Sequence, residues 1–451
     1  GGQRQEQRGH RQSSLDPKIP PTISLDTVIF LDLASTLVQG APSNRGPPPD
    51  HPHRTIAAGG RHSLAIRSGH VFSWGGGALW DEGEVFVAHL GRGIEWGDAD
   101  PLPAAVTGLE GVHAVEVAAG DMHSMVVGDD GCVYSAGAGW EGSLGHCDQG
   151  CLPHFQVVRE LSGIRIEQIA AGGTHSLAIS TEGTLFSWGW GRHGQLGHGD
   201  FESQLAPKLV AALAGVRVAH VAAGASHTLI VTATGELHSC GKADSGQLGH
   251  SPMTHTPLLQ VHTPRRIEAL SAVRVLHAAA GGGHSLAVTA GSAVYSWGAN
   301  QSGQLGHGDT SLRHLPSRIA CLPLDSTALP RVEAGHACSL LIGSPSAGAF
   351  YYCGALGSKK DGKDGFSMER QLWTECLMGT EPGQVQAGMA HILVAERSSC
   401  CSLPTTSNAS PPRPPQRPCI FSMGCADVGQ LGLGDYVTQP RPVQVPDVFF
   451  E

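Results

Sequence analysis

One short motif recurs seven times along the chain, and this repetition constrains the fold more than any other feature. Well-preserved copies read AAGGRHSLAI, AAGGTHSLAI and AAGGGHSLAV, whereas the sixth and seventh copies read EAGHACSLLI and QAGMAHILVA. The first glycine of each copy falls at Gly59, Gly120, Gly172, Gly224, Gly281, Gly335 and Gly388, so successive copies lie 52 to 61 residues apart. A period of about 50 residues indicates a solenoid or a propeller rather than a string of independent domains.

Each repeat has the pattern of short strands joined by tight turns. The copy from Ala170 to Asp200 places a Glu182-Gly183 turn between an apolar strand and an aromatic one. Glycine supplies the positive φ that tight hairpin turns demand. Segments between copies, such as GVRVAHVAAG, add a strand ending in small residues, which suit a crowded axis. About four strands per repeat predict an all-β fold, a seven-bladed β-propeller whose closure leaves few sheet edges exposed.

The ends of the repeat pattern predict how the chain is organised. Residues 1–53 precede the pattern and are expected to form a partly disordered extension, and residues 54–451 are expected to form the propeller. The pattern starts at RTIAAGG and stops at RPVQVP. Both points look as if they lie within a repeat and not at a boundary between repeats. We therefore expect the N- and C-terminal strands to complete one blade between them and so close the ring. The Pro-rich stretch 398–418 interrupts the last hairpin and is expected to be a long disordered loop.

Charge and composition narrow the classes of partner and compartment. The net charge is -10, whereas nucleic-acid-binding domains usually show a basic face, so no direct nucleic-acid binding is expected. The apolar run TVIFLDLASTLVQG is interrupted by Asp32 and is too short to span a bilayer, and no signal peptide precedes it. The twelve cysteines include no CxxC pair. We expect reduced thiols and a monomer in the cytoplasm or nucleus, with no membrane association.

Two glycine-rich segments resemble nucleotide-binding loops, but the residues that follow each of them do not fit such a site. The GxGxxG string from Gly189 to Gly194 runs into the repeat's own GQLG turn instead of the helix that a dinucleotide site needs. The string from Gly357 to Lys363 is followed by Asp364, where a phosphate-binding loop has Ser or Thr. No GxSxG elbow or HExxH helix occurs. The sequence therefore predicts no catalytic residue, no cofactor and no metal, although a catalytic triad assembled from distant loops stays open.

Histidine recurs at one position of the motif and is the natural candidate for a metal ligand. Six copies carry it, at His62, His123, His175, His227, His284 and His391. Cys338 takes its place in the sixth copy. Equivalent residues of different blades form a ring and are usually too far apart to share one metal ion. We therefore predict structural histidines that hydrogen-bond nearby turns, and we interpret the second row, His146, His198, His250 and His307, in the same way.

Three strings together carry a family resemblance. The AGxxHS motif is joined by Ser-Trp-Gly at Trp74, Trp188 and Trp297, and by GQLG starting at Gly194, Gly246, Gly303 and Gly429. Over roughly residues 54–446 the chain resembles the regulator-of-chromosome-condensation repeat family. The resemblance implies a seven-bladed propeller. Its founding member is a guanine-nucleotide exchange factor for the small GTPase Ran, which uses a wedging loop and polar residues of one propeller face. Other members are an ultraviolet-B receptor and propellers attached to ubiquitin ligases.

The chain departs from both specialised members. The exchange factor carries an important Asp directly before one motif histidine, whereas Asp121 lies one residue earlier here. The receptor carries its sensing tryptophans two residues before that histidine. The chain has Gly60, Asp121, Gly173, Ala225, Gly282, His336 and Met389 at that position. We therefore expect a regulatory protein-interaction propeller. Guanine-nucleotide exchange on a Ran-like small GTPase is the alternative, and ultraviolet-B sensing is disfavoured.

Three places are candidates for binding a protein partner. The first copy continues after Trp74 as GGALWDEGEVFVAHLGRGIEWGDADPLP, without the regular GQLG turn, and predicts a projecting hairpin. Aromatic residues beside charges are typical of binding anchors, although packing of the aromatic residues back onto the blade is the alternative. The hairpin candidates are Trp80, Asp81, Glu82, Glu84, Phe86 and Arg92. The degraded sixth copy predicts a positive spot at Lys359, Lys360 and Lys363, with simple decay of a repeat as the alternative. Asp121 is the third candidate for binding a protein partner.

Overall fold

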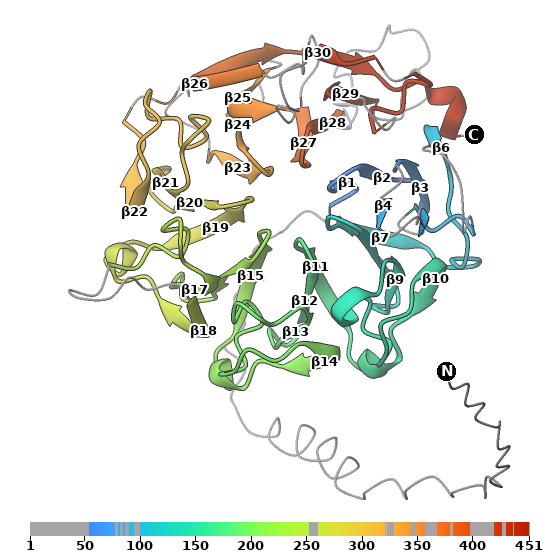
Figure 1. Ribbon diagram of the computed structural model, residues 1–451, viewed down its shortest axis with the longest axis horizontal. Coiled ribbons are helices and arrows are strands. Elements are labelled where there is room, and N and C mark those ends of the chain that lie inside the picture. The colour runs from blue at the N-terminus through green and yellow to red at the C-terminus, as the bar shows by residue number, and fades with distance from the viewer. Residues whose placement is uncertain are drawn as a thin grey trace, which may run out of the picture. The chain divides into compact units, whose positions relative to one another are not determined.

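The computed structural model describes most of the chain from residue 54 onward. Within residues 54–450 the exceptions are 77–79, 82–83, 86–89, 94–99, 252–259, 321, 323–328, 344–348, 357–367, 379–381, 397–418, 426–429 and 436. The expected N-terminal extension and the Pro-rich stretch 398–418 therefore lie outside the described residues. Seven four-stranded antiparallel sheets are arranged as blades around one axis, which confirms the predicted all-β, seven-bladed propeller (Figure 1).

Strands at equivalent places in the blades have similar bounds. The innermost strands are β1 (Ile56–Ala58), β7 (Ala114–Ala119), β11 (Ile166–Ala171), β15 (Val218–Ala223), β19 (Val275–Ala280), β23 (Arg331–Ala334) and β27 (Pro382–Ala387). The second strands are β2 (His62–Arg67), β8 (His123–Gly128), β12 (His175–Ser180), β16 (His227–Thr232), β20 (His284–Thr289), β24 (Cys338–Ile342) and β28 (His391–Glu396). The motif therefore spans the turn between the first and second strands of each blade.

The two outer strands complete each sheet. The third strands are β3 (His70–Gly75), β9 (Val133–Gly137), β13 (Leu185–Gly189), β17 (Leu237–Lys242), β21 (Val294–Gly298), β25 (Ala349–Leu356) and β29 (Ile420–Gly424). The outermost strands are β6 (Asp100–Ala105), β10 (Leu152–Val157), β14 (Gln204–Leu209), β18 (Gln260–Arg266), β22 (Arg313–Arg318), β26 (Met368–Leu377) and β30 (Gln439–Gln444). Among the short 3-10 turns, η2 (Trp140–Gly142) lies between β9 and β10 of blade 2. The others follow an outermost strand: η3 (Arg159–Leu161), η4 (Ala211–Leu213), η5 (Glu268–Leu270) and η7 (Asp447–Phe450).

The turn between the second and third strands has the predicted glycine conformation. Gly183 has a φ of +80° in the β12–β13 hairpin, where its N–H donates to the carbonyl of Ser180. Because L-residues with side chains rarely adopt this φ, Glu182-Gly183 is the sequence cause of the tight turn. Apolar residues of neighbouring blades then pack face to face. One such layer combines Met125 and Val127 of blade 2 with Ile169 and Trp188 of blade 3, and all four are fully buried.

The expectation that the two chain ends share a blade is wrong. Blade 1 consists of β1, β2, β3 and β6, and blade 7 consists of β27 to β30, so each sheet is built from consecutive strands. The physical reason is that RTIAAGG is a complete innermost strand, so the pattern starts at a blade boundary. The ring closes instead where the first and last blades meet. There Arg67 forms an ion pair with Asp447 at 2.8 Å, and Phe450 packs edge-on against Phe72 at 5.2 Å.

Across the described part of the chain, no helix combines the length and the apolar character needed to cross a membrane.

Candidate functional site

The axis of the propeller is encircled by a closed ring of seven backbone hydrogen bonds. In each blade the residue after the first motif glycine donates its N–H to the carbonyl of the motif glycine in the next blade, at 3.0 to 3.3 Å. The donors and acceptors are Gly60–Gly120, Asp121–Gly172, Gly173–Gly224, Ala225–Gly281, Gly282–Gly335, His336–Gly388 and Met389–Gly59. The backbones of neighbouring blades come so close here that the motif glycines leave no room for a side chain. A Cβ on Gly120 would lie 2.5 Å from the carbonyl oxygen of Gly172.

The motif histidines form a second ring of contacts between blades. Each Nε2 lies 2.8 to 3.1 Å from a hydroxyl oxygen of the following blade. The pairs are His62–Ser124, His123–Ser176, His175–Thr228, His227–Ser285, His284–Ser339 and His391–Ser63. The Thr228 hydroxyl donates in turn to the carbonyl of Gln195 at 2.7 Å. Because the hydroxyl donates there, we assign the Nε2–H of His175 as the donor to Thr228.

Burial keeps these histidines neutral. It lowers the pKa of His123 to about 4, and it lowers that of His175 to about 3, where the neighbouring His123 and His227 act in the same direction. Burial likewise lowers the pKa of His227 to about 4. The neutral imidazole of His175 donates to the hydroxyl group of Thr228 and thereby links blade 3 to blade 4. The sequence did not predict that the hydrogen-bond partner belongs to the next blade.

The tryptophans and the GQLG turns complete this junction. Trp297 Nε1 donates to the carbonyl of Gln247 at 2.8 Å, and Ser285 donates to the same carbonyl at 2.7 Å. Trp188 and Ser176 share the carbonyl of Ser143 in the same way. One turn carbonyl of each such blade thus accepts from two side chains of the next blade. This arrangement explains why AGxxHS, Ser-Trp-Gly and GQLG occur together in the repeat.

The junction between blades 6 and 7 lacks this link. Cys338 replaces the histidine in blade 6, and Ile392 replaces its hydroxyl partner in blade 7. Both side chains are fully buried in one apolar cluster with Val394 and Met423. The two substitutions therefore compensate each other: a hydrogen-bonded contact is replaced by an apolar one, and no polar group of the pair is left buried without a partner.

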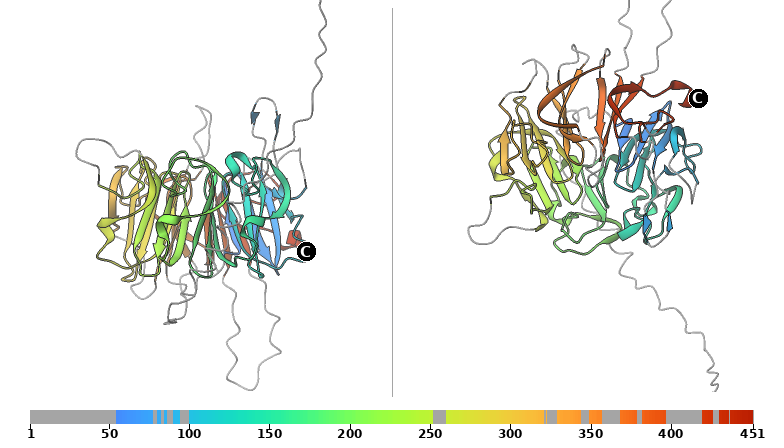
Figure 2. Two further views of the ribbon diagram at one scale, coloured as in Figure 1. Left: turned by 90° about the horizontal axis from the view of Figure 1, so that it is seen from below. Right: turned by 45° about the horizontal axis from the view of Figure 1, so that its top comes forward.

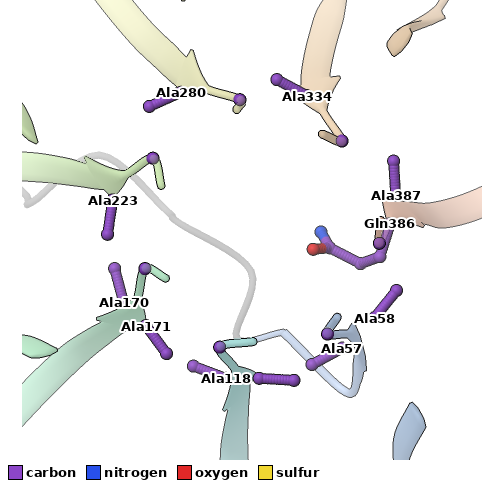
Figure 3. Close-up of a pocket in the computed structure, with 18 of the residues that line it drawn as sticks. Ala57, Ala58, Ala118, Ala170, Ala171, Ala223, Ala280, Ala334, Gln386 and Ala387 are labelled. Atoms are coloured by element: carbon purple, nitrogen blue, oxygen red, sulfur yellow. The ribbon is translucent and has the colours of Figure 1, made fainter. Parts of the chain in front are cut away.

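Small residues line an axial cavity of about 110 Å³ (Figure 3). Most innermost strands contribute alanine pairs, such as Ala170 and Ala171, to the wall. The exceptions are Glu333 and Gln386, and Glu333 forms an ion pair with Arg54 at 3.7 Å. Asp121 and His336 also line the cavity, at the turns that follow the motif glycine. Burial raises the pKa of the Asp121 carboxyl group, and His336 acts in the opposite direction.

Known sequences resemble this chain over most of its length. The model of the RCC1-like domain matches residues 3–341. The ultraviolet-B receptor UVR8 of Arabidopsis thaliana is 32% identical over 396 residues, which cover 86% of this chain and 80% of the receptor. The chain belongs to the RCC1-like family. The human E3 ubiquitin-protein ligase HERC2 is 34% identical over 290 residues, or 63% of this chain, but the match spans only 6% of the ligase.

Solved structures show the same RCC1-like fold. Prp20p of Saccharomyces cerevisiae superimposes with a TM-score of 0.66 at 23% identity, covering 85% of this chain and 87% of Prp20p. Human WBSCR16 superimposes with a TM-score of 0.64 at 23% identity, covering 81% of this chain and 95% of that protein. At these identities the likeness concerns the fold alone.

In this RCC1-like blade 1, Arg92 takes the place of a second-row histidine. In blade 3, His198 Nε2 lies 3.0 Å from the Ser187 hydroxyl. In blade 1, Arg92 Nε donates to the Ser73 hydroxyl at 3.0 Å, and its guanidinium also pairs with Asp100. The Arg92 side chain is only 5% exposed. In this geometry Arg92 bonds within blade 1, and Leu90-Gly91 is the Leu-Gly of the regular turn, which the insertion hides in the sequence.

The expected hairpin is present in the insertion that precedes this turn. Strands β4 (Trp80–Asp81) and β5 (Glu84–Val85) pair antiparallel, with Trp80 opposite Val85 and Asp81 opposite Glu84. Figure 2 (left) shows these two short strands standing off one face of the ring. The register of blade 1 indicates which face, because Gly75 at the end of β3 pairs with His62 at the start of β2. The hairpin therefore leaves blade 1 at the same end as the motif turns.

Several predicted partner-binding residues lie outside the described part of the chain. They are Glu82, Phe86, Lys359, Lys360 and Lys363. The structure brings the hairpin backbone and Asp121 to one face, and it places Arg92 inside blade 1. Among the described residues, no group of three or more His, Cys, Asp or Glu side chains is arranged to hold a metal ion.

Proposed function

We infer that this chain is a regulatory protein-interaction propeller whose binding face carries the motif turns and the β4–β5 hairpin. The observation that carries this inference is the hairpin itself, inserted after β3 at the same end of the blades as the motif turns. Hairpins on a rigid scaffold are the usual carriers of recognition, because a loop can vary while the framework stays fixed.

The histidines that recur in the repeat form contacts within the framework, and this supports binding rather than catalysis. The histidines of the motif bond to neighbouring blades and are kept neutral by burial, as His175 shows. The framework residues thus serve ring stability, and the variable residues at the motif turns and in the hairpin are left for recognition. Asp121 belongs to this variable set, as do the hairpin residues Trp80 and Glu84.

Relatives and neighbours support a protein partner. They include a receptor and E3 ligases, and Prp20p is described with its binding properties to Gsp1p and histones. A second structure shows yeast RCC1 (Prp20) bound to Kap60. The receptor's ultraviolet response is not extended to this chain, because no tryptophan stands two residues before the motif histidine position in any of the seven copies.

Guanine-nucleotide exchange is the alternative, and the position of the hairpin favours it. The insertion follows the Trp74-Gly75 end of a third strand, the type of position from which the exchange factor of this family projects its wedge. An exchange factor acts by binding the nucleotide-free GTPase better than the nucleotide-bound one. Such activity requires no covalent chemistry from the propeller.

Affinity capture from a cell lysate with the intact chain tests the proposed function. A triple change of Trp80, Glu82 and Glu84 to Ala should abolish capture of the specific partner, as quantified by mass spectrometry. Glu182→Ala is the matched control, because Glu182 is exposed at the opposite end of a blade. Equal capture by the folded triple variant would contradict the inference. Nucleotide release from a captured GTPase, with and without the chain, then decides the exchange alternative.

A further inference from the structure

The mouth of the axial cavity is asymmetric in size and charge. The residue after the motif glycine is Gly173, Ala225 or Gly282 in blades 3, 4 and 5, so these blades present a shelf of small residues. The blades on either side carry Asp121 in blade 2 and His336 in blade 6.

Both flanking side chains lean over this shelf. The Oδ2 atom of Asp121 lies 3.2 Å from the place that a Cβ on Gly173 would occupy. The Nδ1 atom of His336 lies 2.9 Å from the place of a Cβ on Gly282. The carboxylate and the imidazole therefore approach the shelf from its two ends. Larger residues at the two glycine positions would fill this space.

The Asp121 carboxylate has no partner of its own among the described residues. Glu333, deeper in the same cavity, is paired with Arg54, whereas no hydrogen bond or ion pair reaches the Asp121 side chain in that part of the chain. Although the mouth leaves part of Asp121 accessible to solvent, surrounding protein raises the pKa of its carboxyl group. Burial disfavours the charged form of Asp121 more than the electrostatic attraction of His336 favours it, so a bound cation would stabilise that form.

The shelf and the cavity wall next to it offer apolar contacts for an aliphatic stem. The wall is built from methyl groups, among them those of Ala171, Ala223 and Ala280 (Figure 3). Lysine and arginine combine an apolar stem with a cationic head, so they match methyl walls beside a single carboxylate. A guanidinium has enough N–H donors to serve a carboxylate and a second acceptor at once.

We propose that the axial mouth is a socket for one basic side chain of a protein partner, held by Asp121 at its head group and flanked by His336. The proposal rests on the proposed function only for the source of that side chain. The socket itself is a property of the free chain, so a small molecule can probe it.

The test uses n-propylguanidinium, which reproduces the arginine head group and stem, with the intact chain. Binding is followed by the Cε1–H signal of His336 in proton–carbon correlation spectra at constant ionic strength. We expect saturable binding with a dissociation constant on the order of 1 to 10 mM, as is usual for so small a ligand. Neutral n-propylurea, which has the same shape, should bind at least about tenfold more weakly if the carboxylate recognises charge.

Three variants complete the design. Asp121→Asn should weaken propylguanidinium binding at least about tenfold, a loss typical of a charged hydrogen-bond partner. Ala225→Leu keeps the carboxylate and fills the shelf, so it should weaken binding even if Asp121→Asn fails to fold. Glu182→Gln removes an exposed acid at the opposite end of blade 3 and should change nothing.

Two results would overturn the proposal. Equal binding of propylurea, or unchanged binding to both Asp121→Asn and Ala225→Leu, would show an apolar cavity without charge recognition. Undiminished capture of the partner by Asp121→Asn would also reject the socket, and it would leave the proposed function intact. Undiminished capture by the hairpin variant bears on the proposed function alone, because the described hairpin residues, Trp80 and Glu84 among them, are not part of the cavity lining.

Discussion

At the scale of single residues, the chain is held together by a repeated trio of imidazole, hydroxyl and turn carbonyl. His175, Thr228 and the carbonyl of Gln195 show it most simply, with contacts of 3.1 and 2.7 Å. All three groups are buried, so each depends on the others for its hydrogen bonds. Removing the central hydroxyl should therefore cost more than the loss of one exposed hydrogen bond.

Thr228→Val tests this dependence without a change of volume. The substitution leaves the His175 Nε2 without its partner and leaves the Gln195 carbonyl with only the weak thiol donor of Cys240 at 3.5 Å, and buried unsatisfied groups cost about 1–3 kcal/mol each. We expect a loss of about 2–4 kcal/mol in the free energy of unfolding, measured by urea denaturation. Ile392→Val, at the matching place in blade 7, removes only a methylene group and should cost about 1 kcal/mol. A smaller loss for Thr228→Val than for Ile392→Val would contradict the account.

The same histidines predict how stability depends on pH. Burial lowers the pKa values of His123 and His227 to about 4, and burial with neighbouring histidines lowers those of His175 and His284 to about 3. The unfolded chain then binds more protons than the folded chain between these values and about pH 6.5, the ordinary pKa of histidine. The stabilisation is complete above about pH 6.5 and is lost as the pH falls towards 4 and 3.

The measurement is the free energy of unfolding by urea at a series of pH values from neutral to mildly acidic. Each shifted histidine contributes a slope of up to about 1.4 kcal/mol per pH unit below its unfolded pKa. Asp121 and Glu333 act in the opposite direction, because burial raises both pKa values. The histidines outnumber them, so we expect a net fall. A flat or rising stability from about pH 6.5 to 5 would show that the histidines are not held neutral.

At the scale of elements, the seven blades are not joined equally. Blades 6 and 7 meet through Cys338 and Ile392, whereas the other junctions have the histidine and hydroxyl pair. The regular junction adds directional hydrogen bonds to apolar packing. Among the described residues, the junction of blades 6 and 7 has apolar packing, the axial backbone bond from His336 to Gly388 at 3.2 Å, and a side-chain hydrogen bond between Gln386 and Glu333, but no histidine and hydroxyl pair. We therefore expect this junction to open first.

Hydrogen exchange with mass spectrometry measures that order. Amides of β24 and β28 should exchange faster than those of β12 and β16, which occupy the same places in blades 3 and 4. Because all four strands are central in their sheets, differences in strand position do not explain such a result. Equal protection of the two pairs, or greater protection of β24 and β28, would reject the weak junction.

Particular elements show what the sequence predicts and what it hides. Strands and turns within one blade follow from local patterns such as Glu182-Gly183, and the β4–β5 hairpin follows from the insertion after Gly75. Blade-to-blade partners lie one repeat apart, as His175 and Thr228 do, and no local pattern reveals them. One signal was available: Cys338 and Ile392 are both exceptions to the motif, in consecutive copies. The turn at Leu90-Gly91 was missed because the insertion separates it from its strand.

At the scale of the whole molecule, the propeller is a closed frame with two different ends. Seven backbone bonds around the axis include the one that joins the last blade to the first, Met389 to Gly59 at 3.1 Å. One end of the blades carries the motif turns, Asp121 and the β4–β5 hairpin. The opposite end carries short hairpin turns such as the one at Gly183. We therefore propose that recognition uses the first end.

Hydrogen exchange of the chain with and without its purified partner tests this assignment most directly. We expect the partner to protect the amides around Asp121, His336 and β4–β5. We also expect exchange at the opposite end, around Gly183 and Gly235, to stay unchanged. Protection confined to the Gly183 and Gly235 turns, with unchanged exchange around Asp121 and the hairpin, would contradict the account.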